Sequence, residues 1–257
     1  MKKSYFNVIA FLVAALIPVL ASAQFGLPAG FNVKEFHKNE DLALWFLQYD
    51  STAIRVSAFD RNLAGKDIVC IPEKSGWKVA AGKITDEGLT EARYYQVDSK
   101  NIVSNLKKKP DTTQFTSIAK ALYHAQLNIS KLNIKNVSWK KFPKVNEDLS
   151  ITVYAFCDGD PSGMIWYGPE YAWYFSSNGE TQIANKSISK APMMAGKSAN
   201  GLNLSCPAEK MPTLGIIWMA HRFRNTYKEV TVDYKTGIST FVYNPSDHVY
   251  AWEHNAK

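Results

Sequence analysis

The hydrophobic pattern of the second half of the chain constrains its fold most. From about Trp139 onward, apolar and polar residues alternate with a period of two, which is typical of strands with one buried face. Turn-forming residues interrupt this alternation at 158–163, 177–179 and 235–237. Because tight turns join antiparallel neighbours, the pattern predicts an antiparallel meander or sandwich. The expected strands are 150–157, 164–167, 171–176, 181–187, 214–223, 229–234, 239–243 and 249–252.

The first half of the chain combines helical and strand patterns. Apolar residues at helical spacing predict one helix from Asn39 and a second over 113–127. Asp86-Glu87-Gly88 lies between two alternating segments, 77–85 and 89–97, as in a β-hairpin. The sequence therefore predicts an α+β fold, mainly antiparallel β-sheet, with two helices from the N-terminal half packed on it.

The change of hydrophobic period also suggests how the chain is divided. We expect an α+β N-terminal half, 24–135, and an antiparallel β-rich C-terminal half, 136–257; one continuous domain over 24–257 is the alternative. Residues 190–211 contain several prolines and glycines and are expected to form a long loop. No internal repeat is apparent in the sequence.

The first 23 residues have the features of a secretory signal peptide. Lys2 and Lys3 precede an apolar segment, 6–20, and Ala21-Ser22-Ala23 supplies the small residues that signal peptidase reads. An uncleaved membrane anchor is the alternative, but this apolar segment is shorter than the ~20 residues that span a bilayer. We therefore expect cleavage after Ala23, no transmembrane segment after cleavage, and an extracytoplasmic location, periplasmic or secreted. The short basic start resembles bacterial signal peptides.

The charge distribution bears on the partners. The formal net charge is +7, and short basic runs occur at 107–109 and 140–141. Neither run reaches the roughly five like charges of a nucleic-acid-binding arm, so we expect no nucleic-acid partner. Envelope surfaces or acidic polymers are the anionic partners that fit export, and a solvated basic face is the alternative.

Three cysteines allow at most one disulfide. Cys157 and Cys206 both lie in the strand-rich half, so we expect that pair to form if any does in an oxidising compartment. Cys70 lies in an apolar run and is expected to be a buried, unreactive thiol.

Aromatic residues gather around the Gly168-Pro169 bend. Trp166, Tyr167, Tyr171 and Trp173 lie on the two short strands expected on either side of it. Aromatic rings in such an arrangement can stack on sugar rings or apolar ligands, so these four residues are the candidate ligand-binding site. Core packing with ordinary cross-strand pairs is the alternative.

The C-terminal segment holds the candidate catalytic residues, Asp247, His248, Glu253 and His254. On a strand, residues 248, 252 and 254 share one face, so two imidazoles could meet at a metal or proton-transfer site. A polar tail whose histidines meet only water is the alternative. Zinc, phosphate-loop and serine-hydrolase motifs do not occur, and the Asp158–Gly163 turn lacks the further oxygens of a calcium loop. We therefore expect no metal and no cofactor.

These features favour an exported, non-catalytic binding or accessory protein of the cell envelope, with a glycan, a peptide or a protein as its ligand. One alternative is an envelope hydrolase that uses the C-terminal histidine and carboxylate residues. Another is an inhibitor or immunity-type protein that inserts the 190–211 loop into the active site of a partner. The sequence does not identify the envelope ligand or protein partner.

Overall fold

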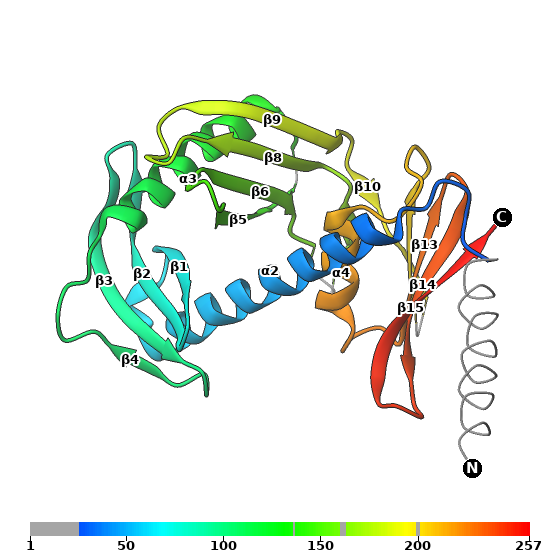
Figure 1. Cartoon of the computed structure of the whole chain (residues 1–257), viewed down its shortest axis with the longest axis horizontal. Helices are drawn as coiled ribbons and strands as arrows, with labels where there is room; N and C mark the ends of the chain where they lie inside the picture. The colour runs from blue at the N-terminus through cyan, green and yellow to red at the C-terminus, as the bar shows by residue number, and fades with distance from the viewer. Residues whose placement is uncertain (1–25, 136, 160–162, 199–200) are drawn as a thin grey trace, which may run out of the picture. The chain divides into compact units, whose positions relative to one another are not determined.

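The computed structural model describes residues 26–135, 137–159, 163–198 and 201–257. Within these ranges, three α-helices and fifteen strands are arranged in four sheets in which antiparallel pairing dominates (Figure 1). The predicted α+β fold, mainly antiparallel, is confirmed. By length and hydropathy, none of the three described helices could span a bilayer. The predicted signal peptide, residues 1–23, lies outside the described residues.

The chain divides into two compact units. The small unit comprises Met1–Lys38, Gly196–Thr213 and Arg224–Lys257, and the large unit comprises Asn39–Ala195 and Leu214–Phe223. These units are defined by their internal contacts and combine separate segments of the chain. The predicted halves, 24–135 and 136–257, stay a prediction.

In the large unit, a helix followed by a four-stranded antiparallel meander occurs twice (Figure 1). The first set is α2 (Val33–Phe59), which enters the large unit at Asn39, then β1 (Asp67–Glu73), β2 (Gly76–Thr85), β3 (Gly88–Asp98) and β4 (Val103–Asn105). The second set is α3 (Thr113–Lys131), β5 (Trp139–Val145), β6 (Ile151–Cys157), β8 (Glu170–Phe175) and β9 (Gln182–Ser189). Between β6 and β8, the short β7 (Trp166–Tyr167) pairs with β10 (Met193–Met194).

The β2–β3 hairpin forms where the sequence predicts it. Its turn brings Gly88 to a φ of 120°, a region that glycine enters without steric cost. A Cβ at Gly88 would also lie 2.7 Å from Cγ2 of Thr116 in α3. Glycine is therefore needed at this turn both for its backbone conformation and for the close approach of the helix.

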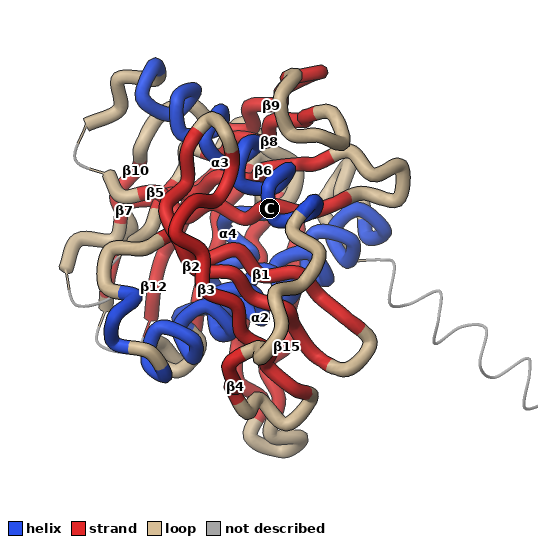
Figure 2. Tube along the Cα trace, turned by 90° about the vertical axis from the view of Figure 1, so that its left-hand side faces the viewer, coloured by secondary structure: helices blue, strands red, loops and turns tan. Residues whose placement is uncertain are grey.

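α3 lies against strands of both large-unit sheets (Figure 1, Figure 2). Its buried face follows the predicted helical spacing and includes Phe115, Ile118 and Leu122. This face packs on Val69 and Ala80 of the first sheet, and on five residues of the second sheet: Ile151, Val153, Ala155, Trp173 and Phe175. One amphipathic helix thus gives the two meanders a common core.

The second sheet of the large unit is covered on both faces. Alternate residues of a strand point to opposite faces, so Val153 of β6 packs toward α3 while Phe156 packs toward the other side. There, the ring of Phe156 stacks on Trp218 at a centroid distance of 5.7 Å, and Phe142 of β5 stacks on Phe46 of α2 at 4.6 Å. This double burial explains why residues 151–157 are almost continuously apolar.

Residues 214–223 form a helix, α4 (Leu214–Phe223), and the strand predicted there is wrong. Nine of its ten residues are buried, including Trp218. The segment is therefore apolar nearly all round, and a short apolar run cannot be assigned to helix or strand from its periodicity. Its burial in the large unit decided its conformation.

The small unit contains one five-stranded sheet. The strands lie in the order β11 (Gly196–Lys197), β12 (Gly201–Cys206), β13 (Glu229–Tyr234), β14 (Gly237–Asn244) and β15 (Val249–Ala256). β12 and β13 are parallel, and the other neighbours are antiparallel. The prediction of a long loop over 190–211 is wrong, because β10, β11 and β12 all lie in it. Within β12, Leu202, Leu204 and Cys206 are buried and alternate with more exposed residues, as in an ordinary strand.

Candidate functional site

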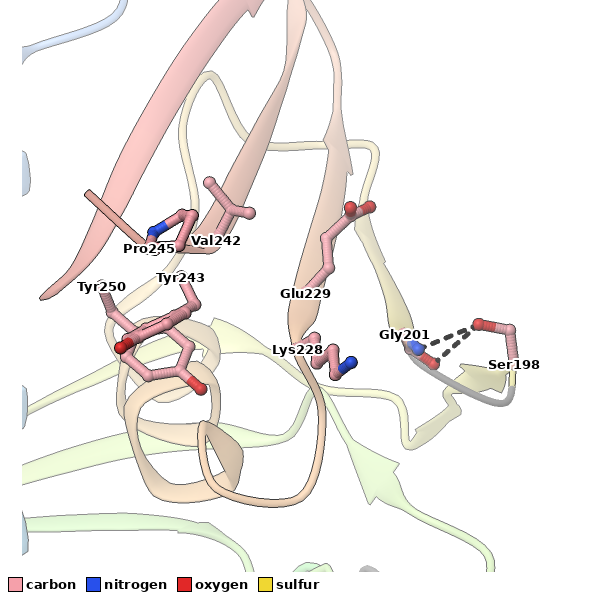
Figure 3. A pocket seen from close by; sticks show the side chains of 8 residues that line it. All are labelled: Ser198, Gly201, Lys228, Glu229, Val242, Tyr243, Pro245 and Tyr250. Carbon is pink, nitrogen blue, oxygen red and sulfur yellow. Dashed lines mark hydrogen bonds between the residues drawn. The ribbon is translucent and has the colours of Figure 1, made fainter. Parts of the chain in front are cut away.

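The small unit carries a pocket of about 710 Å³ at one end of its sheet (Figure 3). β12, β13 and β15 begin at this end and β14 finishes there, as the registers Gly201↔Glu229, Glu229↔Val242 and Asn244↔Val249 require. The pocket is therefore built from strand ends and the loops that continue them. Its lining residues are Ser198, Gly201, Lys228, Glu229, Val242, Tyr243, Pro245 and Tyr250.

Two tyrosines form the aromatic wall of this pocket. Tyr243 of β14 and Tyr250 of β15 are cross-strand partners whose ring centroids lie 5.2 Å apart at an angle of 54°. The Tyr243 hydroxyl lies 3.0 Å from Nδ1 of His248, and the Tyr250 hydroxyl donates to the carbonyl of Arg224. Tyr243 is 38% exposed. The rings are thus held by hydrogen bonds at their hydroxyls while part of their surface stays open.

Charged side chains from the start of β13 lie across the pocket from the tyrosines (Figure 3). Lys228 and Glu229 are both exposed, and Glu229 accepts a hydrogen bond of 2.9 Å from the Thr231 hydroxyl. By strand alternation, Glu229 and Val242 belong to the sheet face opposite the tyrosines, so the pocket surrounds the end of the sheet. A molecule that touches both the ring faces and the Glu229 carboxylate must therefore extend around the end of the sheet.

The lining has few groups suited to acid–base or nucleophilic chemistry. The eight lining residues include one carboxylate, Glu229, and one ammonium, Lys228. The Ser198 hydroxyl is engaged with Gly201, accepting from its N–H at 3.0 Å and donating to its carbonyl at 3.3 Å. A nucleophile beside a general base, which covalent catalysis requires, is not present among these lining residues.

The aromatic residues predicted to bind a ligand lie in the large unit and are largely packed. Tyr167 and Trp173 are only 4% exposed, and Trp166 and Tyr171 are half-buried. The rings of Tyr171 and Trp173 are nearly parallel, with centroids 5.4 Å apart, but Trp173 belongs to the core beneath α3. The four rings are not brought together on one exposed face. A ligand-binding role for them stays a prediction.

The two C-terminal histidines lie at opposite ends of β15. His248 precedes the strand and is exposed beside Tyr243, whereas His254 is half-buried near its end. Nδ1 of His254 lies 2.7 Å from the Ser239 hydroxyl, and its ring packs on Phe31 and Phe36 at centroid distances of 4.3 and 4.6 Å. Six residues at ~3.3 Å each separate the two histidines by about 20 Å. The structure therefore does not bring the two imidazoles together.

The neighbouring carboxylates are also separate. Asp247 accepts a hydrogen bond of 2.9 Å from the Asn244 amide, and Glu253 is exposed on β15 opposite Thr240. Among the described residues, no group of three or more histidine, cysteine or carboxylate side chains is arranged to hold a metal ion. Of the hydrogen bonds described here for the predicted catalytic residues, the one between His248 and Tyr243 reaches the lining of the small-unit pocket.

All three cysteines are buried, and Cys70 and Cys157 are free thiols. Burial raises the pKa of the Cys70 thiol far above its ordinary value. Burial, with the nearby charges of Glu170 and Asp158, raises the pKa of Cys157 to about 12. Both thiols are therefore protonated at neutral pH, the opposite of what a cysteine nucleophile needs. Cys157 belongs to the large unit and Cys206 to the small unit, and their disulfide stays a prediction.

α4 makes polar contacts that the sequence did not identify. Nε2 of His221 lies 3.2 Å from Oε1 of Glu40 in α2. The guanidinium of Arg222 pairs with Asp158 and lies 4.9 Å from the centroid of the Trp218 ring. Because these groups come from α2, α4 and the end of β6, we interpret them as contacts that hold α4 within the large unit.

Sequence reasoning missed the lining of the small-unit pocket. A signal was present, because Tyr243 and Tyr250 flank the turn-forming run Asn244-Pro245-Ser246-Asp247. A hairpin through that run places the two tyrosines opposite each other. The contributions of Ser198 and Lys228 depend on how β12 and β13 pair, which no local pattern specifies.

Comparison with protein-family models, with curated proteins and with solved structures finds no match to this chain.

Proposed function

We propose that this protein is an exported, non-catalytic binding protein of the cell envelope whose small-unit pocket binds a glycan. The proposal rests on one observation: an open pocket of about 710 Å³ that combines two partly exposed tyrosine rings with Lys228 and Glu229. Its volume lies within the ~300–1,000 Å³ range of small-molecule sites. The export of the protein rests on the sequence of residues 1–23.

The chemistry of the lining favours a sugar over a purely apolar ligand. The C–H faces of a pyranose pack on aromatic rings, and its hydroxyls both donate and accept hydrogen bonds. Tyr243 and Tyr250 supply the rings, while Lys228 can only donate and an ionised Glu229 can only accept. A ligand with many hydroxyl groups satisfies both.

The same lining argues against a glycoside hydrolase. Glycosidases ordinarily place two carboxyl groups on either side of the scissile bond, about 5–9.5 Å apart. The pocket has the single carboxylate of Glu229 among its described lining residues. Recognition without cleavage is therefore the activity that this set of side chains supports.

Binding can be tested on a glycan array with the purified mature chain, followed by calorimetric titration of any glycan found. Tyr243→Ala removes a stacking ring that contributes ~1 kcal/mol to binding, so it should weaken binding about fivefold. Tyr243→Phe keeps the ring and should bind nearly as well as the native protein. Tyr123→Ala changes a half-buried tyrosine of α3 in the large unit and serves as the control. Absence of glycan binding, or unchanged binding by Tyr243→Ala, would contradict the proposal.

Export can be tested separately by the intact mass of the protein recovered from outside the cytoplasm. A start at Gln24, with or without loss of ammonia from that residue, is expected. A mass that retains residues 1–23 would contradict the localisation and leave the binding test unaffected.

A further inference from the structure

A second cavity, of about 170 Å³, lies in the large unit. Its walls come from α2, β1, α3 and β5, so it shares no element with the small-unit pocket. Its apolar lining includes Trp45, Ile71, Ile118, Pro143 and Val145, and Cys70 also lines it.

The cavity lies where the edges of the two large-unit sheets approach each other. β1 and β5 are each the first strand of their sheet and pair on one side only. The carbonyl of Ile68 and the N–H of Cys70 both bind the Tyr49 hydroxyl, so these backbone groups point away from β2. Because the direction of the backbone polar groups alternates along a strand, the backbone of Pro72 also points outward. The N–H of Asn146 donates to the carbonyl of Ser150, so it points toward β6. By the same alternation, the backbone of Pro143 points to the outward side of β5.

Proline has no N–H to donate, so each edge lacks a donor at this position. A backbone ladder between β1 and β5 is blocked there, and the two meanders remain separate sheets. Side chains of α2 and α3 border the resulting gap. The cavity therefore follows from the way two proline-bearing edges meet.

The surface of the cavity is more apolar than polar, and several of its lining residues are buried. Cys70 and Ile118 are each 2% exposed and Pro143 is buried, while the Trp45 indole is half-buried. Burial keeps the Cys70 thiol uncharged, so this residue adds no charge beside the cavity. An apolar cavity of about 150 Å³ in another protein stays dry and accepts benzene. The present volume of 170 Å³ is therefore sufficient for one six-membered ring.

The rim of the cavity is more polar than its interior. Gln114 of α3 is exposed and Lys144 of β5 is half-buried, and both line the cavity. A ring that enters past them can leave one polar substituent beside an amide and an ammonium. We propose that this cavity binds a small monocyclic aromatic molecule with a single polar substituent, independently of the small-unit pocket.

Phenol is a suitable probe, because it joins one ring to one hydroxyl group. Calorimetric titration of the native chain should show one saturable site. Val145→Phe inserts a ring into the cavity and should weaken phenol binding at least about tenfold, since the space is then filled. Val103→Phe makes the same change at a half-buried position of β4 outside the cavity lining, and should bind phenol within about twofold of the native chain. Failure of the native chain to bind phenol, or native-like binding by Val145→Phe, would overturn the proposal.

Trp45 provides a second measurement that does not depend on Val145→Phe folding. Phenol should change the tryptophan emission of the native chain, and Trp45→Phe should lose that change, because the indole lines the cavity. An emission change that persists in Trp45→Phe would place phenol elsewhere and overturn the assignment. Tyr243→Ala should bind phenol like the native chain, so failure of the glycan proposal would leave this result unchanged.

Discussion

The amide N–H of Gly215 donates a hydrogen bond of 3.0 Å to the carboxylate of Glu170, and both groups are buried. This bond joins the first turn of α4 to β8 within the large unit. A helix N-terminus has N–H groups without intrahelical partners and a positive dipole end, so a carboxylate is well suited to this position. The contact is also tight, because a Cβ on Gly215 would lie 2.8 Å from Cδ of Glu170 and 2.9 Å from Cδ1 of Phe156.

Gly215→Ala should therefore destabilise the protein. The added methyl group must displace Glu170 or Phe156, and overpacking of this kind costs about 1–3 kcal/mol. Urea denaturation followed by circular dichroism measures the change in the free energy of unfolding. Gly163→Ala is the control, because a Cβ there meets nothing within 4 Å. Equal stabilities for the two variants would contradict the packing of α4 against β8.

Trp173→Ala should cost about 3–5 kcal/mol of stability, because it removes a large buried ring from the core beneath α3. Trp166→Ala changes a half-buried ring at the same bend and should cost clearly less. Thermal unfolding of both variants gives the comparison. If Trp173→Ala instead unfolds like the native chain and loses binding of a ligand, the aromatic bend is a binding face and its packed description is wrong.

Asp60 should have an unusually acidic side chain. Its carboxylate accepts hydrogen bonds from the Tyr95 hydroxyl at 2.7 Å, from the Asn62 N–H and from Arg93, and these lower its pKa to about 2. The folded pKa lies below the ~4 of an unfolded aspartate, so the ionised Asp60 carboxylate stabilises the folded state. This stabilisation is present above about pH 4 and is lost as pH falls toward 2.

Tyr95→Phe removes the largest of these effects and should raise the pKa of Asp60. NMR titration of the Asp60 carboxyl carbon measures the shift directly. The variant should also lose less stability than the native chain between about pH 4 and 2, because less of its stability depends on that ionised carboxylate. An unchanged titration curve would show that the tyrosine hydroxyl does not stabilise the carboxylate.

The thiols of Cys70 and Cys157 should react slowly with a disulfide reagent at pH 8 and quickly after unfolding, because both are buried with raised pKa values. Absorbance of the released thiolate gives the number of reactive groups in each state. Peptide mapping without reduction then tests the Cys157–Cys206 disulfide predicted from the sequence. A bridge that contains Cys70 would contradict both that pairing and the buried free thiol.

The local sequence pattern is sufficient to predict a helix or strand where buried residues recur regularly along one face of that element. The helix over 113–127 was predicted because Phe115, Ile118 and Leu122 recur at helical spacing, and these residues are the buried face of α3. The β2–β3 hairpin was predicted from its turn residues and the alternation on either side. In such elements the spacing of apolar residues shows which face is buried, so the α+β class could be predicted from the sequence.

Tertiary structure alone decided the features that depend on distant partners. The sequence of α4 predicts a strand, and this prediction is wrong. Ile216, Ile217 and Trp218 are consecutive apolar residues, and a segment buried on nearly all sides has no period that distinguishes helix from strand. The small-unit pocket requires β12 to pair in parallel with β13, which brings Gly201 beside Glu229. The large-unit cavity requires two sheet edges to meet at Pro72 and Pro143. The sequence by itself determined which local elements can form, because their periodicity records one buried face; which elements meet, and what space remains between them, was decided by pairing across the chain.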